Sequence, residues 1–238
     1  MKSQTTLAKD FFELCQKGTV KQVREAIALG ADVNAENIDE LTPLMLAAAS
    51  NTSAVVRTLI QVGAEVNATD SLFRTPLMFA AASNGRPNVI EALIKAGAEV
   101  NGSDLFYQTP LLAAITESNT PEVISALLQA GADPNKTVPQ GLPPLIQAIT
   151  HNNVPAVIQA LIDAGADPNA QDEFCQTPLM YVIEYNSDFI IAEILIAAGA
   201  DKSNLDLRYP GATDYVKLPP PGTKGAVVVE KEGEAPKS

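Results

Sequence analysis

Residues 30–34 read Gly-Ala-Asp-Val-Asn, and this short run decides the fold because it returns along the chain. Gly-Ala followed by an acid occurs six times, beginning at Gly30, Gly63, Gly97, Gly131, Gly165 and Gly199. The intervals between these glycines are 33, 34, 34, 34 and 34 residues. A fixed period of this length is typical of a solenoid, in which small supersecondary units stack on one another. A stacked array is expected to present a long surface and no natural pocket, so the first question is what it binds.

A second fixed element follows eight residues after each of the first five Asn positions. It reads Thr-Pro-Leu from Thr42, Thr75, Thr109 and Thr177, and Pro-Pro-Leu from Pro143. Thr before Pro predicts a helix start, because the hydroxyl can cap a backbone N–H and Pro suits the first helical position. A second helix follows after a polar break, and its apolar residues predict one buried face. The Gly of the next run then ends that helix, most simply in a left-handed conformation.

This unit resembles the ankyrin repeat, which has a β-turn finger, two antiparallel helices and a Thr-Pro-Leu opening. The resemblance covers about residues 8–205 and implies an all-α class, an α-solenoid of stacked repeats. The Ser-Asn-x-Pro-x-Val-Ile run between the helices resembles bacterial versions of the repeat. One departure lies after Thr-Pro-Leu, where the family usually has His. This chain has Met45, Met78, Leu112, Ile146 and Met180 there, so we expect apolar packing to replace the hydrogen bonds of that His.

The repeat sets the expected domain organisation. We expect a capping helix pair at 1–34 and five repeats within 35–205, at about 35–67, 68–101, 102–135, 136–169 and 170–203. A C-terminal extension at 206–238 follows, disordered from about residue 217 because its Pro-rich and charged composition offers no core. In the fourth repeat Pro143 replaces the capping Thr, which predicts a softer helix start there.

Charge and cysteine content limit the classes of partner and site. The chain of 238 residues has a formal charge of −12, and six of its acids belong to the repeat motif, so most of this charge is a solvated feature. The acidic balance argues against nucleic acid, whose phosphates need a basic face. Cys15 and Cys175 lie at opposite ends of the array, so neither a disulfide nor a metal pair is expected.

The start of the chain and its hydropathy predict the compartment. Met1-Lys2-Ser3-Gln4-Thr5-Thr6 lacks the apolar run of a signal peptide, and no stretch is long enough to span a bilayer. Together with reduced thiols, these features predict a cytoplasmic protein without a membrane partner. Export as an effector stays open.

The chain offers few candidate catalytic residues. The single histidine, His151, falls where a loop is expected to begin, and neither Cys has a His nearby in sequence. The chain has no Gly-rich phosphate loop and no cluster of His and Cys at metal spacing. The sequence therefore predicts no enzyme, no cofactor and no metal. Asp70 and Asp104 recur at one finger position and are interpreted as turn formers.

The expected finger tips carry the candidate partner-binding residues. In the ankyrin family, partners usually bind the tips and the exposed side of the first helices, which together form a concave surface. The family commonly has Asp-Gly at the tip, whereas this chain has apolar residues there. The candidate residues are Ile38, Leu72, Phe73, Arg74, Phe79, Leu105, Phe106, Tyr107, Gln108, Phe174, Gln176, Tyr181 and Tyr185. Aromatic side chains with Arg are typical of an interface centre, and the Gln and Arg side chains could orient a partner.

Several interpretations of these residues stay open. Neighbouring fingers could pack the aromatic rings against one another, which would leave no exposed surface. If the rings are exposed, the sequence predicts a non-enzymatic interaction scaffold or adaptor that binds another protein. One alternative is an effector or inhibitor that acts on a target protein in a host or competing cell, and another is a small-ligand binder or enzyme. We expect a monomer, although an apolar face could also pair with a second copy of the chain.

Overall fold

The computed structural model describes residues 4–83, 85–118, 120–139, 141–151, 153–185 and 189–202. Every regular element in these ranges is a helix, so the predicted all-α class is confirmed. The chain divides into two compact units, Met1–Pro139 and Gln140–Ser238. The predicted C-terminal extension at 206–238 lies outside the described residues.

The first unit contains four pairs of helices. These are α1 (Gln4–Lys17) with α2 (Val20–Ala28), α3 (Pro43–Ser50) with α4 (Ser53–Gln61), α5 (Pro76–Ser83) with α6 (Pro87–Lys95), and α7 (Pro110–Ala113) with α8 (Pro121–Gln129). A π-helical turn, η1 (Ala114–Ser118), extends α7. The second unit contains α9 (Pro144–His151) with α10 (Pro155–Asp163), and α11 (Pro178–Glu184) with α12 (Phe189–Ala197). Each predicted repeat contains one such pair, and the exact repeat boundaries stay a prediction.

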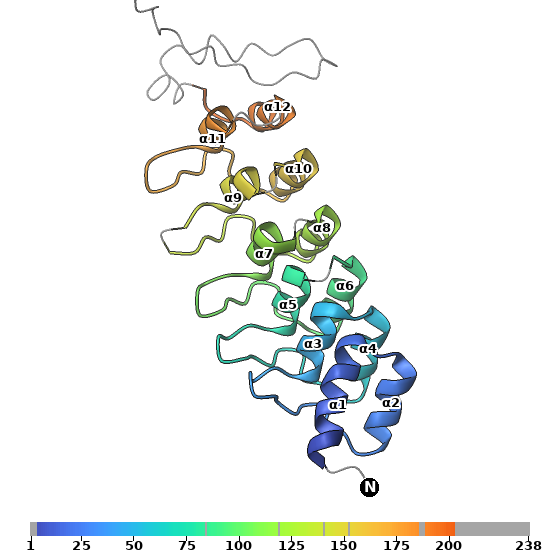
Figure 1. Cartoon of the computed structure of the whole chain (residues 1–238). Coiled ribbons are helices and arrows are strands. Elements are labelled where there is room, and N and C mark those ends of the chain that lie inside the picture. Colours follow the sequence, from blue (N-terminus) through green and yellow to red (C-terminus); the bar gives the residue numbers. More distant parts are fainter. Residues whose placement is uncertain are drawn as a thin grey trace, which may run out of the picture. The chain divides into compact units, whose positions relative to one another are not determined.

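The helices of the first unit form two layers. The first helices, α1, α3, α5 and α7, pack in order along one layer, and α2, α4, α6 and α8 pack along the other. The loops between successive pairs are the fingers, and they project on the side of the first helices (Figure 1). Fully buried alanines such as Ala47 and Ala80 lie on the first helices, where their small side chains let neighbouring helices approach closely.

The helix starts follow the expected chemistry. The hydroxyl oxygens of Thr42, Thr75, Thr109 and Thr177 each accept a hydrogen bond from the backbone N–H three residues on, at 3.2–3.4 Å. This confirms the predicted caps. The expectation that apolar packing alone replaces the family's His needs a correction at Met45. Its side chain is fully buried, but its sulfur also accepts the Thr42 N–H at 3.4 Å, which retains a weak hydrogen bond.

The Asn of four Gly-Ala-acid-x-Asn runs joins one repeat to the next, a role that was not predicted from the sequence. Asn67 donates its side-chain N–H to the Gly97 carbonyl at 2.9 Å and accepts the Glu99 N–H at 3.0 Å. Asn34, Asn101 and Asn169 make the same pair of bonds with the repeat that follows. The six motif glycines all have φ between 88° and 97°, as predicted for left-handed helix ends. These bonds fix the base of each finger relative to its neighbour.

Candidate functional site

Each described finger turn is built around one polar side chain. In the third finger, Asp104 Oδ1 accepts the backbone N–H of Phe106 and of Gln108, both at 2.8 Å, and the Asp104 carbonyl accepts the Tyr107 N–H at 3.0 Å. Asp70 makes the same bonds in the second finger, which confirms that both acids are turn formers. Asn37 and Asp172 do the same in the first and fifth fingers.

The last residue of each of these turns has a left-handed backbone. The φ angles are 58° for Glu40, 60° for Phe73, 62° for Tyr107 and 58° for Cys175. This region suits glycine, because a Cβ there collides with the neighbouring carbonyl at a cost of roughly 1–2 kcal/mol. The chain therefore places two aromatic side chains where stability alone would favour glycine.

Four apolar side chains of the second and third fingers are exposed, and we call them the fingertip patch: Phe73, Leu105, Phe106 and Tyr107. The exposed fractions of the three aromatic residues are 57%, 62% and 56% respectively. The two fingers lie side by side, because the Leu105 N–H donates to the Leu72 carbonyl at 2.8 Å. The fingers thus contact each other through their backbones without burying the rings, and Leu72 itself is half-buried beside them.

At the base of the second finger, Arg74 contacts two other side chains of the same repeat. Arg74 pairs with Asp70 Oδ2 through its Nε and Nη2 atoms, both at 2.7 Å. The Arg74 guanidinium also lies 4.7 Å from the centre of the Phe79 ring. Both Arg74 and Phe79 are half-buried, so they are accessible in part. The first finger contributes Ile38, which is almost fully exposed.

The second unit holds the remaining candidates, and two of them need a correction. Tyr181 is only 7% exposed, and its hydroxyl donates to Asp172 Oδ2 at 2.8 Å. Gln176 is 6% exposed and donates to Glu184 Oε2 at 2.9 Å. Burial, and then the hydrogen bond to Asp172, raise the pKa of the Tyr181 hydroxyl far above its usual value. Both side chains hold the fifth finger in place and present little surface to a partner.

Two other candidates of that unit are accessible. Tyr185 is exposed and stacks on Tyr181 with ring centres 5.8 Å apart. Phe174, at the tip of the fifth finger, is also exposed.

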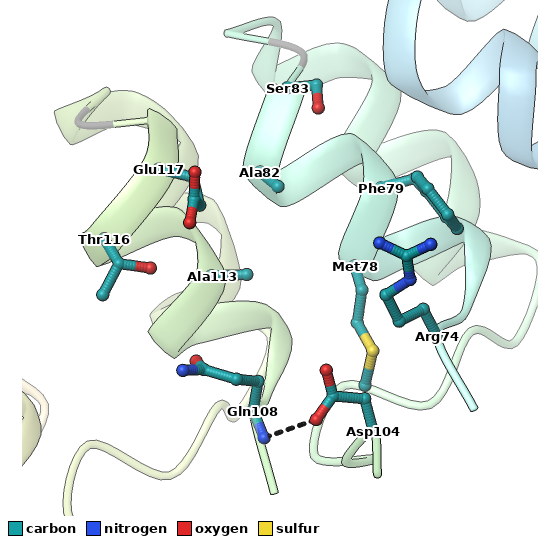
Figure 2. Close-up of a pocket in the computed structure, with 10 residues that line it drawn as sticks. All are labelled: Arg74, Met78, Phe79, Ala82, Ser83, Asp104, Gln108, Ala113, Thr116 and Glu117. Carbon is teal, nitrogen blue, oxygen red and sulfur yellow. Dashed lines mark hydrogen bonds between the residues drawn. The ribbon is translucent and has the colours of Figure 1, made fainter. Parts of the chain in front are cut away.

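A cleft lies between α5 and the α7–η1 segment, at the base of the fingers that carry the fingertip patch. Its volume is about 370 Å³, and its lining includes Met78, Phe79, Asp104, Ala113 and Glu117. Figure 2 shows Ala113 facing α5 across this space, with the Asp104 carboxylate below it. Thr116, which donates to the Leu112 carbonyl at 3.0 Å, also lines it. The expectation of a surface without a natural pocket is therefore wrong for the first unit.

Gln108 also lines this cleft, but its amide points away from the Asp104 carboxylate (Figure 2). Its Oε1 atom is buried and has no hydrogen-bond partner among the described residues. The role foreseen for Gln108, to orient a partner by its side chain, therefore has no support from its placement.

Comparison with known proteins decides the family. The family model for ankyrin repeats (3 copies) matches residues 11–104, 81–172 and 110–206. The chain belongs to the ankyrin-repeat family. Among solved structures, it is similar to an ankyrin repeat domain from Acinetobacter baumannii, with 26% identity and a TM-score of 0.68 over 83% of this chain and 97% of the other. No curated protein matches the chain.

Ankyrin-repeat proteins are generally protein-binding scaffolds. The structure also places the histidine and the two cysteines of this chain. His151 is exposed at the end of α9, with Nδ1 at 3.1 Å from both the Thr150 hydroxyl and the Gln147 carbonyl. Cys15 is fully buried, and burial raises the pKa of its thiol to about 12. Cys175 is exposed, and neither thiol forms a disulfide.

Within the described part of the chain, no three acidic, His or Cys side chains are grouped to hold a metal ion. None of the described helices is long and apolar enough to cross a membrane.

Proposed function

We propose that this ankyrin-repeat protein is a non-enzymatic interaction scaffold that binds a protein partner through the fingertip patch. The left-handed backbone of Phe73 and Tyr107 is the observation that carries this proposal. Strained backbone persists where the surrounding structure imposes it, and it clusters at binding sites. The finger turn needs only a left-handed residue, which glycine supplies at the lowest cost. Folding therefore does not explain an exposed aromatic ring at both tips, whereas contact with a partner does.

The area of the fingertip patch is consistent with part of an interface. An aromatic side chain can bury about 150–250 Å². At the exposed fractions above, the three rings and Leu105 offer roughly 400 Å² to a partner. A standard interface needs about 800 Å² on each side, so the patch supplies about half of one. A partner must also cover neighbouring surface, such as the half-buried Leu72, Arg74 and Phe79 or the cleft beneath them.

Affinity capture from a soluble extract of the source organism tests this proposal. The bait is the full chain, compared with a variant that carries Phe73→Ser, Phe106→Ser and Tyr107→Ser. Truncating several central aromatic contacts costs on the order of 1–2 kcal/mol each, so the captured protein should bind the variant roughly 100-fold or more weakly. The interaction is then measured directly with the purified partner.

A matched control removes exposed apolar side chains elsewhere in the first unit. Leu29 and Val62 are exposed at the C-terminal ends of α2 and α4, in the other helix layer. Leu29→Ser with Val62→Ser should leave capture unchanged. Equal capture by the wild type and the fingertip variant would refute the proposal, provided that circular dichroism shows both to be folded.

A further inference from the structure

We infer that the cleft between α5 and η1 receives a lysine or arginine side chain of the protein partner. This inference rests on the proposed function, because the cleft lies at the base of the fingers that carry the fingertip patch. Asp104 belongs to both features. It opens the turn that presents Leu105, Phe106 and Tyr107, and its carboxylate lines the cleft.

The cleft is open because the third repeat has a small residue where other repeats have larger ones. Positions one repeat apart on the first helices are Phe79, Ala113, Gln147 and Tyr181. Phe79 lies against Arg74, and the Tyr181 hydroxyl reaches Asp172 at its own finger base. Ala113 has no atoms beyond Cβ, and that Cβ faces α5 (Figure 2). The space that a ring fills in the second and fifth repeats is therefore open in the third.

The acids at the finger bases also differ between repeats in the partner of their second carboxylate oxygen. Oδ2 of Asp70 takes the Arg74 guanidinium, and Oδ2 of Asp172 takes the Tyr181 hydroxyl. Oδ1 of Asp104 accepts two backbone N–H groups, as in the other fingers. Within the described part of the chain its Oδ2 has no hydrogen bond, because the Gln108 amide points away and Ala113 cannot reach it.

A second carboxylate comes from η1. Glu117 is exposed, lines the cleft and forms no ion pair within the described residues. The π-helical turn from Ala114 to Ser118 makes this first helix one residue longer than α5 or α9.

The walls and charges together fit a basic side chain. Met78, Phe79, Ala82 and Ala113 offer apolar surface to the methylene stem of lysine or arginine. Asp104 lies at one end of the cleft and Glu117 at the other, so a charged end finds a carboxylate acceptor at either end (Figure 2). The one cation in the lining, Arg74, is neutralised by its ion pair with Asp70. A volume of about 370 Å³ lies near the lower end of ligand pockets, which suits a single side chain.

The charge of the chain favours the same class of partner. Its formal charge is −12, and Asp39 and Glu40 at the first finger tip are exposed and acidic. An acidic surface raises the association rate of a basic partner and disfavours acidic ones. The partner that we infer therefore combines apolar residues for the fingertip patch with one lysine or arginine for the cleft.

The test uses a displayed library of random 12-residue peptides, selected against the full chain. We expect the bound peptides to share one lysine or arginine next to apolar residues. A selected peptide is then titrated against the wild type and against a variant with Asp104→Asn and Glu117→Gln. We expect about tenfold weaker binding, because each partly exposed charge pair is worth a few-fold. The substitution at 104 should keep the turn, because Asn37 makes the same bonds in the first finger.

Three further variants sharpen this measurement. Ala113→Phe should fill the cleft, as Phe79 does one repeat earlier, and should also weaken binding. Asp39→Asn with Glu40→Gln removes two charges outside the cleft and should change affinity less than twofold at physiological salt. A peptide whose basic residue is replaced by glutamine should bind the wild type about tenfold more weakly. That peptide should not distinguish the wild type from the Asp104→Asn, Glu117→Gln variant.

The outcomes separate this inference from the proposed function. One outcome is that the selected peptides lose affinity when Phe106 and Tyr107 are replaced, yet share no basic residue and bind the Asp104→Asn, Glu117→Gln variant as tightly as the wild type. That result would overturn only the inference that the cleft receives a basic side chain. Peptides that ignore both the fingertip and the cleft substitutions would overturn both proposals, and a library without any binder would count against both. Glu117→Gln alone, at an exposed position, repeats the test if the double variant is less stable.

Discussion

Glycine at position 107 should give a more stable protein than alanine, which reverses the usual order of these two residues. Tyr107 has a φ of 62°, in the region where a Cβ is penalised. Comparing Tyr107→Gly with Tyr107→Ala isolates this penalty, because both variants lack the ring and differ only in the Cβ. Phe73 has a φ of 60°, so comparing Phe73→Gly with Phe73→Ala repeats the measurement at a second site.

The expected difference follows from two opposing terms. A residue with a Cβ pays about 1–2 kcal/mol for the left-handed conformation. Glycine loses roughly 0.4–1 kcal/mol more than alanine through the entropy of its unfolded chain. Glycine should therefore be favoured by about 0.5–1 kcal/mol. This difference corresponds to about 1–4 °C in Tm for a domain of this size. Ser71 is exposed and lacks a positive φ, so Ser71→Gly should be less stable than Ser71→Ala.

Urea unfolding followed by circular dichroism measures these differences as shifts in midpoint at constant slope. All variants at position 107 should weaken partner binding alike, because each lacks the ring. If Tyr107→Gly proves no more stable than Tyr107→Ala, the left-handed turn is not strained. An aromatic residue at position 107 would then cost no stability, and the proposal of a binding role would lose its main support.

Three other measurements test the array itself. Asn67→Ala should lower the free energy of unfolding by about 1–2 kcal/mol, because it removes the hydrogen bonds to Gly97 and Glu99. The control Asn88→Ala, at an exposed site, should be nearly neutral. Equal effects of the two substitutions would contradict the linking role of Asn67. Pro143→Thr should raise Tm by about 2 °C, because a cap worth about 1 kcal/mol outweighs the lost rigidity of proline, and an unchanged Tm would refute the soft fourth repeat. A thiol reagent at pH 8 should label Cys175 at once and Cys15 only upon unfolding, because Cys15 is buried with its pKa raised to about 12. Rapid labelling of two thiols in the folded protein would contradict that burial.

Local chemistry made much of this fold predictable from the sequence. Thr42 and its equivalents mark helix starts because a hydroxyl before proline caps the backbone, and Gly97 marks a helix end because it tolerates a positive φ. The bonds of Asn67 were missed, although its recurrence was visible. Its partners lie about 30 residues further along the chain, and nothing local indicates which atoms the stacking brings to it.

The candidate site was predictable only in part, for a similar reason. The sequence left open whether the finger rings are exposed or packed against each other, and Phe73 and Tyr107 are exposed. Phe79 and Tyr181 occupy equivalent positions, yet Tyr181 is buried and donates its hydroxyl to Asp172, whereas Phe79 has no hydroxyl and lies half-buried against Arg74. The surroundings of each ring thus depend on contacts within its own repeat that the sequence position does not reveal.

The repeat itself provides the reference that distinguishes folding from binding. What recurs in most repeats, such as the capping Thr and the linking Asn, is accounted for by helix starts and stacking. What occurs in one repeat and weakens it has no such account. The third repeat combines an Asp104 carboxylate oxygen that has no hydrogen bond within the described part of the chain with a π-helical turn that follows one small residue, Ala113. A stacked array gains nothing from these features, so their concentration beside exposed aromatic rings favours selection for a ligand.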